Sequence, residues 1–308
     1  MSNHTGDTVL ISEVGPRDGL QSIKTIMPTA FKLKWISALY DAGVREIEVG
    51  SFVPSKLLPQ LADTAEVVAH ALQHPGLTVM ALVPNLRGAV TAFEAGVHKI
   101  TLPISASVAH SQANVRKTPE EMMEEAKRIV AYRDANFPAI SIEAGISTAF
   151  GCTLQGKVDE DDVIRLSVMA AQAGIDDIGL SDTTGYANPK QVRRLFRRLF
   201  DEVGEKAGAA HMHNTRGLGI ANCLAAFEEG VRTFDSSQGG LGGCPYAPGA
   251  SGNVVTEDLV FMFEAMNVKT HINYEKLMQA RVALQEGLPN EPIYGMTPEA
   301  GLPKGFIQ

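Results

Sequence analysis

The stretch Asp41-Ala-Gly-Val-Arg-Glu-Ile-Glu-Val-Gly50 decides the fold, because close variants of it recur three more times along the chain. The later copies occupy residues 94–102, 172–181 and 228–237. Each copy runs from the end of a helical pattern, through a glycine suited to the left-handed position after a helix, into a short strand-like run. Repeated units of helix, glycine stop and buried strand are typical of βα units around a parallel sheet.

The rest of the chain completes an α/β pattern. Four further short apolar or alternating runs predict strands at residues 8–14, 77–83, 139–145 and 209–213. Helical patterns lie at residues 31–41, 63–73, 119–135, 159–173, 189–203 and 218–229. Roughly eight strands, each followed by a helix, predict a (β/α)8 TIM barrel, a fold of typically ~250 residues. We expect this barrel over residues 1–266 and a C-terminal extension, packed on the barrel or on a partner, over residues 267–308.

A doubly wound open sheet is the alternative architecture. Such a sheet usually carries a G-x-G-x-x-G turn after its first strand. Here that place is occupied by Glu13-Val-Gly-Pro-Arg-Asp-Gly19, which lacks this glycine spacing. The barrel is therefore the better interpretation.

The composition is that of an ordinary globular enzyme. The 308 residues are 44% hydrophobic and 20% charged, which suits a packed core and excludes wholesale disorder. The formal net charge of -8 argues against a nucleic-acid surface. The basic cluster at residues 193–198 has the spacing of a solvated face on an amphipathic helix.

Cysteine usage and hydropathy indicate the expected compartment. Three cysteines without a C-x-x-C pair do not make a disulfide framework, so a reducing cytoplasm is the simplest expectation. The first residues, Met1-Ser-Asn-His-Thr-Gly-Asp7, have neither the basic start nor the apolar run of a signal peptide. No stretch approaches the ~18 apolar residues of a membrane span. We therefore expect neither a membrane nor a nucleic acid as a partner.

Candidate site residues gather at the carboxyl ends of the predicted strands, where TIM barrels keep their active sites. The first four strands supply Glu13, Arg17, Asp18, Glu48, Ser105 and His110, and the last four supply Ser147, Asp182, His211, His213 and Asp235. Because the strands themselves are apolar, this clustering of polar groups indicates a metal site or a site for a polar ligand.

The sequence His211-Met-His213 is the sharpest metal signal. Residues two apart on a strand face the same side, so both imidazoles can reach one ion, although surface strands also carry such pairs. Asp18 and Asn253 can converge on the same axis and add a carboxylate and an amide oxygen. This donor set, which lacks thiolates, favours Mg²⁺ or Mn²⁺ over a structural zinc site, with Co²⁺ or Zn²⁺ as alternatives.

Three further polar residues each allow two interpretations. Arg17 can clamp a carboxylate or stabilise an oxyanion, or it can form a structural ion pair with Glu48 or Glu13. Asp182 is either a base near the metal or a helix N-cap. His110 is either a substrate contact or an exposed loop residue.

A glycine-dense loop spans residues 239–253, Gly-Gly-Leu-Gly-Gly-Cys-Pro-Tyr-Ala-Pro-Gly-Ala-Ser-Gly-Asn. Glycine loses the most conformational freedom on folding, so such a segment needs a reason, and closure over a ligand is the preferred one. A plain linker is the alternative, but linkers are usually polar and Ser-rich. Cys244 then sits where it can deliver a proton, whereas Cys152 and Cys223 are interpreted as small packing residues.

Two long motifs resemble those of the 3-hydroxy-3-methylglutaryl-CoA lyase family, within a wider group of metal-dependent TIM-barrel lyases and synthases. They are the opening motif, residues 13–21, and the glycine loop continuing into Thr256-Glu-Asp-Leu259. The shorter segments Ser51-Phe-Val-Pro54, Pro84-Asn-Leu86 and Gly151-Cys152 are similar too, so the resemblance covers residues 9 to 270 or so.

The resemblance implies a TIM barrel with the metal ligands Asp18, His211, His213 and Asn253. It implies that Arg17 stabilises an oxyanion and that Cys244 is a mobile proton donor. Glu48 and Asp182 become polar, catalytic neighbours of the metal. The candidate substrate contacts are Gln21, Ser147, His110 and Arg216. The implied reaction is a retro-aldol-type cleavage of a 3-hydroxy-3-methylacyl-CoA, which releases acetyl-CoA and acetoacetate from 3-hydroxy-3-methylglutaryl-CoA.

The sequence departs from the family pattern at Asn214 and Arg216 after the paired histidines, at Val49-Gly50, and at His110. A lyase for a related acyl-CoA, such as citramalyl-CoA, is therefore an alternative. A Claisen-type condensing synthase would share the metal site, but such enzymes lack this Cys-Pro loop and often add a regulatory domain. A non-catalytic metal-binding barrel is a third class. We expect a small-molecule acyl-CoA substrate and a homo-oligomer.

Overall fold

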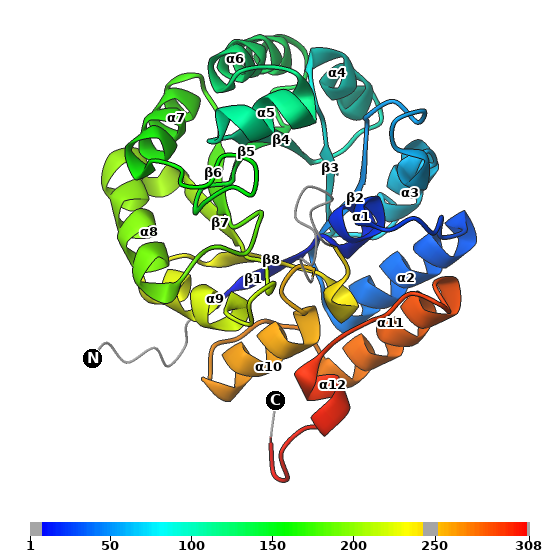
Figure 1. Cartoon of the computed structure of the whole chain (residues 1–308). Coiled ribbons are helices and arrows are strands. Elements are labelled where there is room, and N and C mark those ends of the chain that lie inside the picture. Colours follow the sequence, from blue (N-terminus) through cyan, green and yellow to red (C-terminus); the bar gives the residue numbers. More distant parts are fainter. Residues whose placement is uncertain (1–7, 243–251, 307–308) are drawn as a thin grey trace.

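Eight parallel strands form a closed barrel in the computed structural model, which describes residues 8–242 and 252–306 (Figure 1). The strands are β1 (Leu10–Glu13), β2 (Glu46–Ser51), β3 (Thr78–Leu82), β4 (Lys99–Ser105), β5 (Ser141–Ser147), β6 (Asp177–Ser181), β7 (Ala207–His211) and β8 (Thr233–Ser236). Each strand pairs with the next, and β8 pairs with β1, so the sheet has no free edge. The predicted (β/α)8 barrel is confirmed.

Helices surround this barrel. The predicted helical patterns correspond to α2 (Thr29–Ala42), α3 (Thr64–Ala71), α6 (Pro119–Asn136), α7 (Glu160–Gln172), α8 (Pro189–Val203) and α9 (Gly219–Glu228). The structure adds α1 (Leu20–Ser22), α4 (Leu86–Glu94), α5 (Val108–Val115), α10 (Thr256–Ala265), α11 (Tyr274–Gly287) and α12 (Met296–Ala300). Within residues 8–242 and 252–306, none of the helices combines the length and the apolar character needed to cross a membrane.

The glycines of the four repeated stretches adopt the left-handed backbone that the sequence predicts. Gly43, Gly96, Gly174 and Gly230 have φ values of 109°, 84°, 92° and 110°. At Gly43 an added Cβ would lie 2.2 Å from the carbonyl oxygen of His271, so both the angle and the space require glycine. These glycines end their helices and turn the chain into β2, β4, β6 and β8.

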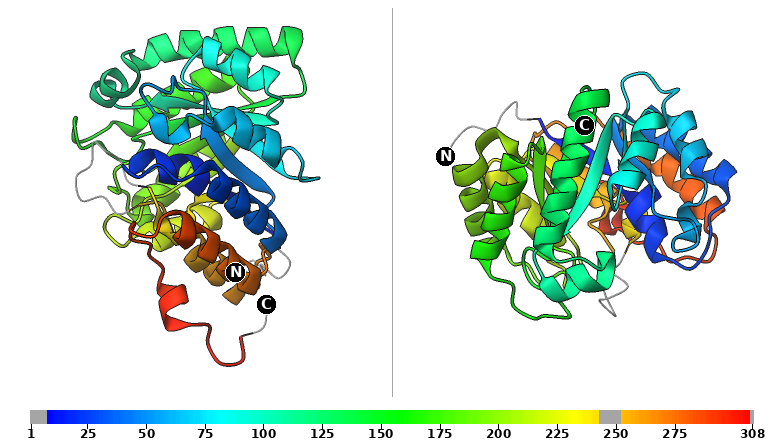
Figure 2. Two further views of the ribbon diagram at one scale, coloured as in Figure 1. Left: turned by 90° about the vertical axis from the view of Figure 1, so that its right-hand side faces the viewer. Right: turned by 90° about the horizontal axis from the view of Figure 1, so that it is seen from above.

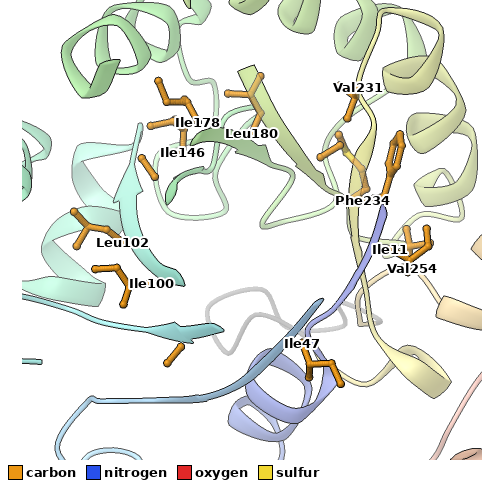
Figure 3. Packing of buried hydrophobic residues seen from close by; sticks show 14 of the residues in the cluster. Ile11, Ile47, Ile100, Leu102, Ile146, Ile178, Leu180, Val231, Phe234 and Val254 are labelled. Carbon is orange, nitrogen blue, oxygen red and sulfur yellow. The ribbon is translucent and has the colours of Figure 1, made fainter. Parts of the chain in front are cut away.

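Side chains alternate along each strand between the helix-facing core and the barrel interior. On β4, Ile100 is fully buried in the core (Figure 3). Its neighbour Lys99 faces the other way, and its Nζ lies 2.6 Å from Glu143 on β5 and 3.4 Å from Asp177 on β6. Carboxylates of two other strands can meet Lys99 only inside the barrel. The odd-numbered residues of β4, which end with Ser105, therefore face the interior.

The helices of the C-terminal segment lie on the outside of the barrel (Figures 1 and 2). Helix α11 packs against α2. Gln238, just after β8, donates from Nε2 to the carbonyl oxygen of Leu277 on α11 at 2.7 Å. The N–H of Tyr294 donates to the carbonyl oxygen of Gly239 at 2.7 Å. The C-terminal segment therefore holds the chain directly where the glycine loop begins.

Helix α8 is amphipathic, as predicted, because Leu195 and Phe196 are buried. Its arginine face is at the surface, as predicted, and it also carries ion pairs. The four arginines form ion pairs with acidic residues of the flanking helices α7 and α9: Arg193–Glu228, Arg194–Glu160, Arg197–Glu229 and Arg198–Asp161. The sequence pattern of one helix does not reveal carboxylates on its neighbours, so the ion pairs were not predicted.

Candidate functional site

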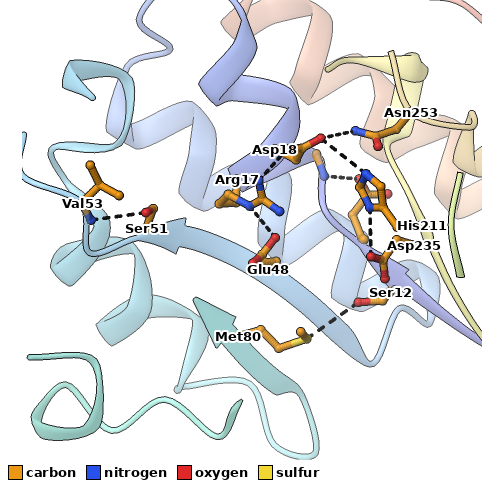
Figure 4. Close-up of polar contacts among 12 residues, drawn as sticks. Ser12, Arg17, Asp18, Glu48, Ser51, Val53, Met80, His211, Asp235 and Asn253 are labelled. Atoms are coloured by element: carbon orange, nitrogen blue, oxygen red, sulfur yellow. Dashed lines mark hydrogen bonds and ion pairs between the residues drawn. The ribbon is translucent and has the colours of Figure 1, made fainter. Parts of the chain in front are cut away.

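Asp18, His211 and His213 converge at the carboxyl end of the barrel, and Figure 4 shows His211 beside Asp18. The ligand atoms of the three residues all lie within 4.8 Å of one another. His211 is the last residue of β7 and His213 follows two residues later. The two Nε2 atoms are 3.1 Å apart, and Nε2 of His211 is 4.0 Å from Oδ2 of Asp18. The structure thus brings together three of the four ligands that the resemblance implied.

Asn253 completes this group. It forms an isolated antiparallel bridge with His213, and its Nδ2 donates to Oδ2 of Asp18 at 2.7 Å (Figure 4). Its Oδ1 is buried and has no hydrogen-bond partner in the part of the chain that the structure describes. A buried carbonyl oxygen without a donor is the group that a cation would satisfy. The four residues therefore fit a divalent ion by the chemistry of a carboxylate, an amide oxygen and two imidazoles.

Asp235 on β8 orients His211 from behind. Oδ2 of Asp235 lies 3.0 Å from Nδ1 of His211, which leaves Nε2 directed toward His213. Burial lowers the pKa of His211, but Asp235 outweighs this and raises it. Burial and the nearby His211 lower the pKa of His213 to about 4. Carboxylates in this position fix the orientation of a ligand histidine and raise its basicity. The sequence placed Asp235 at a strand end without giving it this role.

Arg17 and Asp18 both point into the site because they lie on a π-helical turn, η1 (Gly15–Gly19). The carbonyl oxygen of Val14 accepts from the N–H groups of Arg17 and Asp18 at 3.1 and 2.7 Å. Arg17 donates from Nε to Oε2 of Glu48 and from Nη1 to Oδ1 of Asp18, both at 2.5 Å. Burial would raise the pKa of Asp18, but Arg17 and the two histidines hold it well below its usual range. Arg17 thus forms the ion pair with Glu48 and also points into the site, so the two interpretations of Arg17 do not exclude each other.

Asp182 follows β6 and is almost fully buried. Its Oδ1 accepts from the N–H groups of Tyr186 and Ala187 at 2.8 and 3.1 Å, whereas Oδ2 is buried without a hydrogen-bond partner among the described residues. Burial raises its pKa to about 6. Asn188, and not Asp182, caps helix α8, so the N-cap interpretation is wrong. Asp182 instead holds the β6–α8 loop through Oδ1, and Oδ2 remains able to accept a hydrogen bond.

The β4–β5 side of the mouth, across the barrel from β1 and β8, carries Ser147 and His110. Ser147 is the last residue of β5 and is half-buried. His110 lies on α5 with 4% of its surface exposed, so the expectation of an exposed loop histidine is wrong. Gln21, on α1, is half-buried with Oε1 buried and without a partner in the described ranges. Ser147 and His110 therefore lie on the side of the mouth away from Asp18.

The departures at residues 214 and 216 have local structural partners. Arg216 is exposed and donates from Nη1 to the carbonyl oxygens of Thr184 and Gly185 at 3.1 and 2.8 Å. Its guanidinium carbon lies 4.6 Å from the ring centroid of Tyr186. Oδ1 of Asn214 accepts from the first N–H of α9 at 3.0 Å. Arg216 is therefore held against the β6–α8 loop at the mouth.

Both described ends of the glycine loop pack directly on the candidate ligands, while Cys244 itself lies outside the described residues. Gly242 has a φ of 109°, and an added Cβ there would lie 2.5 Å from Nδ2 of Asn253 and 3.3 Å from Oδ2 of Asp18. At Gly252 an added Cβ would lie 1.9 Å from the carbonyl oxygen of Gly240. Close backbone approach, which only glycine permits, thus explains part of the glycine density.

The role of Glu13 was missed at the sequence level. Its Oε1 accepts from the N–H groups of Gly15 and Gln238, both at 2.9 Å, and its Oε2 accepts from Oγ1 of Thr256 at 2.7 Å. Burial raises its pKa to about 8. Glu13 therefore ties the end of β1 to the segment that follows β8. At the sequence level, its place in the opening motif at the end of the first strand was the signal for Glu13.

Cys152 and Cys223 are buried.

The chain is similar to proteins of known name and structure. The family model described as HMGL-like matches residues 8–283. The curated relatives include hydroxymethylglutaryl-CoA lyase YngG of Bacillus subtilis, 41% identical over 90% of this chain and 92% of its own length. The mitochondrial hydroxymethylglutaryl-CoA lyase of Macaca fascicularis is 41% identical over 88% of this chain and 83% of its own. A solved HMG-CoA lyase of Acinetobacter baumannii, in complex with coenzyme A and 3-methylmalate, has a TM-score of 0.92, 39% identity and coverage of 100% and 99% of the two chains.

Proposed function

This chain belongs to the HMGL-like family, and on that premise we propose that it is a divalent-metal-dependent carbon–carbon lyase. Its substrate is 3-hydroxy-3-methylglutaryl-CoA, which it cleaves to acetyl-CoA and acetoacetate. The observation that carries this proposal is the convergence of Asp18, His211 and His213 within 4.8 Å, beside the unpartnered Oδ1 of Asn253. This group lies at the barrel end where TIM-barrel enzymes place their chemistry.

Asp18, His211, His213 and Asn253 would hold the cation, and we propose Mg²⁺ or Mn²⁺ because the set contains oxygen and imidazole donors without thiolates. A bound divalent cation supplies Lewis acidity, which favours the ionised form of a hydroxyl group. The short contacts of Asp18 with Arg17 and Asn253 keep its carboxylate ionised and fixed in place. The protein therefore offers a prearranged site at neutral pH.

Asp182 is the base that we assign to the hydroxyl proton. Its Oδ2 is buried and unpartnered in the described structure, and a pKa of about 6 leaves the group mostly ionised at neutral pH. When the tertiary hydroxyl loses its proton, the bond between C2 and C3 breaks and C3 becomes the ketone of acetoacetate. The electron pair of that bond moves onto the thioester as an enolate.

Arg17 stabilises the enolate oxygen. The contacts with Glu48 and Asp18 use Nε and Nη1, and among the described residues no hydrogen bond from Nη2 is recorded. The guanidinium is therefore fixed by two carboxylates with donor capacity remaining, which is the preorganised arrangement that oxyanion stabilisation requires. The buried Glu48 acts here by positioning Arg17.

Cys244 is the group that we propose to protonate the acetyl-CoA carbanion. The support is its place in the sequence, two residues after Gly242, which itself packs on Asn253. Two residues of chain span at most ~7 Å, which is compatible with the role that we propose for the thiol. A loop that closes over the site also excludes water from the carbanion.

A different acyl group is less well supported. Arg216 is one of the departures behind the alternative of citramalyl-CoA, and its Nη1 is engaged by the carbonyl oxygens of Thr184 and Gly185. The condensing direction has no observation in its favour.

The test is direct. Purified protein stripped of metal is given Mg²⁺ or Mn²⁺ and a panel of 3-hydroxyacyl-CoA thioesters, and the products are identified by mass. We expect acetyl-CoA and acetoacetate from 3-hydroxy-3-methylglutaryl-CoA, and little cleavage of citramalyl-CoA. His213→Gln should abolish both metal binding and cleavage, whereas His271→Asn, an exposed position at the opposite end of the barrel, should change neither. Metal binding without cleavage of any thioester would favour a non-catalytic barrel.

We propose a cytoplasmic location and a homo-oligomeric state. The location is supported by the sparse cysteines of the chain, although the names of its relatives include both cytoplasmic and mitochondrial lyases. Light scattering of the purified protein measures the oligomeric state.

A further inference from the structure

Two histidines converge on one serine between helices α2 and α3, which pack against each other on the outside of the barrel (Figure 1). His70 lies in the last turn of α3, and His74 lies four residues later, in the turn that follows the helix. Nε2 of His70 is 2.9 Å and Nε2 of His74 is 3.2 Å from Oγ of Ser37 on α2. One ring nitrogen of each histidine is therefore directed to the same point.

These separations are close to those of atoms around a shared ion. Ligand atoms that lie ~2.0–2.1 Å from a tetrahedral ion are about 3.4 Å from one another. The hydroxyl of Ser37 carries a single proton, so it can donate to only one of the two nitrogens at a time. Histidines with the same four-residue spacing on one face of a helix bind zinc in metalloproteases. Both the spacing and the distances therefore suit one ion.

The ring of His74 is held in place by its surroundings. The ring of Tyr40 stacks on it, with the centroids 4.7 Å apart and an angle of 25° between the planes. The hydroxyl of Tyr40 donates to the carbonyl oxygen of Pro75 at 2.9 Å, which fixes the stacking residue beside the turn. The rings of His70 and His74 meet edge to face, with the centroids 5.2 Å apart. Because the rings are held before an ion arrives, less conformational freedom is lost on binding.

The electrostatics of this place favour a cation. Helices α2 and α3 both end here, and the carboxyl ends of helices carry a partial negative charge. Asp41 lies four residues after Ser37 on α2, so the two side chains share one face of that helix. Burial and the neighbouring His70 lower the pKa of His74 against the opposing effect of Asp41, which favours the neutral ring that binds metals. The two histidines and Ser37 are half-buried, so an ion can reach them from solvent.

We propose that His70 and His74 bind one divalent transition-metal ion through their Nε2 atoms, beside the hydroxyl of Ser37. Imidazole ligands suit Zn²⁺, Ni²⁺ and Cu²⁺ better than Mg²⁺ and Mn²⁺, and Zn²⁺ is the probe for the test. Helices α2 and α3 end where β2 and β3 begin, so this site lies at the opposite end of the barrel from Asp18. The ion ties α3 to α2 and takes no part in the chemistry at the mouth. The inference therefore does not depend on the proposed function.

The number of bound ions tests the proposal. The protein is stripped of metal and titrated with Zn²⁺ by calorimetry. His70→Asn and His74→Asn should each bind one equivalent fewer than the unaltered protein. His271→Asn, which changes an exposed histidine outside this group, is the matched control and should bind the same number as the unaltered protein. An equal count in His74→Asn and in the unaltered protein would overturn the proposal.

His213→Gln separates this site from the candidate catalytic site. The variant should keep the equivalent that depends on His74, and the double variant His213→Gln with His74→Asn should lose it. In His213→Gln, free Zn²⁺ at 100 times the measured dissociation constant should raise the ratio of folded to unfolded protein about 100-fold. Equal stabilisation of the double variant would contradict the site. If His213→Gln itself loses no equivalent, the catalytic site is in error, and the count in His74→Asn still decides this one.

Discussion

Arg17 is held by a carboxylate on each side, and this fixes its guanidinium at the barrel mouth. Replacing it with glutamine removes the charge that we propose to stabilise the enolate. We expect turnover of Arg17→Gln to fall about 10²- to 10³-fold, the loss seen when one oxyanion donor is removed. Steady-state kinetics on the acyl-CoA measure this, and thermal unfolding checks the fold. Arg87→Gln, on the exposed face of α4, is the control; turnover near that of the unaltered protein would refute the role of Arg17.

Asp235 acts on the site through His211, so its loss should appear first in metal binding. In Asp235→Asn the histidine keeps a hydrogen-bond partner but loses the charge that orients it. We expect the affinity for Mn²⁺ to fall about 10- to 100-fold, as for other partners that orient ligand histidines. Calorimetry on the metal-free protein gives the value, with the exposed Asp201→Asn as the matched variant. Equal affinities in the two variants would mean that Asp235 has no such role.

Sequence reasoning found the histidine pair because the two-residue period of a strand is a local rule. It suggested Asn253 from its place at the end of the glycine loop, and the family resemblance implied the same residue, but the separation of residues 18 and 253 along the chain carries no local signal of their contact. The role of Asp235 was missed for a related reason. Its contact with His211 depends on the register of β7 and β8, which places the two residues side by side.

At the scale of elements, Gly242 lies at a described end of the glycine loop and packs against Asn253. Gly242→Ala would push a Cβ against Nδ2 of Asn253, 2.5 Å away, so we expect at least ~10-fold weaker metal binding, comparable with the loss of an orienting partner. Gly217→Ala is a matched control, since Gly217 also has positive φ (71°) but no atoms near an added Cβ. Both variants should share the backbone strain of about 1–2 kcal/mol in unfolding experiments. Only Gly242→Ala should bind the metal more weakly. Equal metal affinity in the two variants would contradict a contact between residue 242 and Asn253.

Element boundaries were predictable where capping chemistry is local. Helix α8 begins and ends at the predicted residues, because Asn188 caps it and Pro189 fits its first position. The turn η1 was not predicted, because five residues are too few to show a period. Helix α5 was missed for the same reason, and so the burial of His110 was missed with it.

At the scale of the molecule, the interior of the barrel carries a buried group of charges around Lys99. Glu46 lies 3.8 Å from Lys99, and burial raises the pKa of Glu46 from 4.5 to about 7. A carboxyl group whose pKa is raised by folding contributes stability below its unfolded value, and that stability is lost as pH rises through the folded value. The native protein should therefore lose stability between pH 4.5 and 7 through this group.

Glu46→Gln removes that dependence. We compare the free energy of unfolding of Glu46→Gln with that of the unaltered protein. This difference should change in favour of the variant by about 3 kcal/mol from pH 5 to pH 8, as the shift in pKa implies. Urea denaturation at several pH values measures the difference. The exposed Glu66→Gln should follow the unaltered protein throughout. Parallel stability curves for Glu46→Gln and the unaltered protein would show that Glu46 does not titrate in this range.

The barrel itself was predictable, because the four repeated stretches mark helix ends and strand starts at regular intervals. The charges inside it were not. Lys99, Glu46 and Asp177 lie on three different strands, and only closure of the sheet brings them together. The division between barrel and extension after residue 266 stays a prediction.

The bonds from Gln238 to Leu277 and from Tyr294 to Gly239 have a practical consequence for protein engineering. A truncated variant that lacks the C-terminal segment would lose these two contacts at the start of the glycine loop. The same holds for a design that grafts the eight strands onto another scaffold. The C-terminal segment is therefore as necessary for catalysis as the strands. A variant truncated before this segment should keep the barrel fold more readily than the catalytic activity.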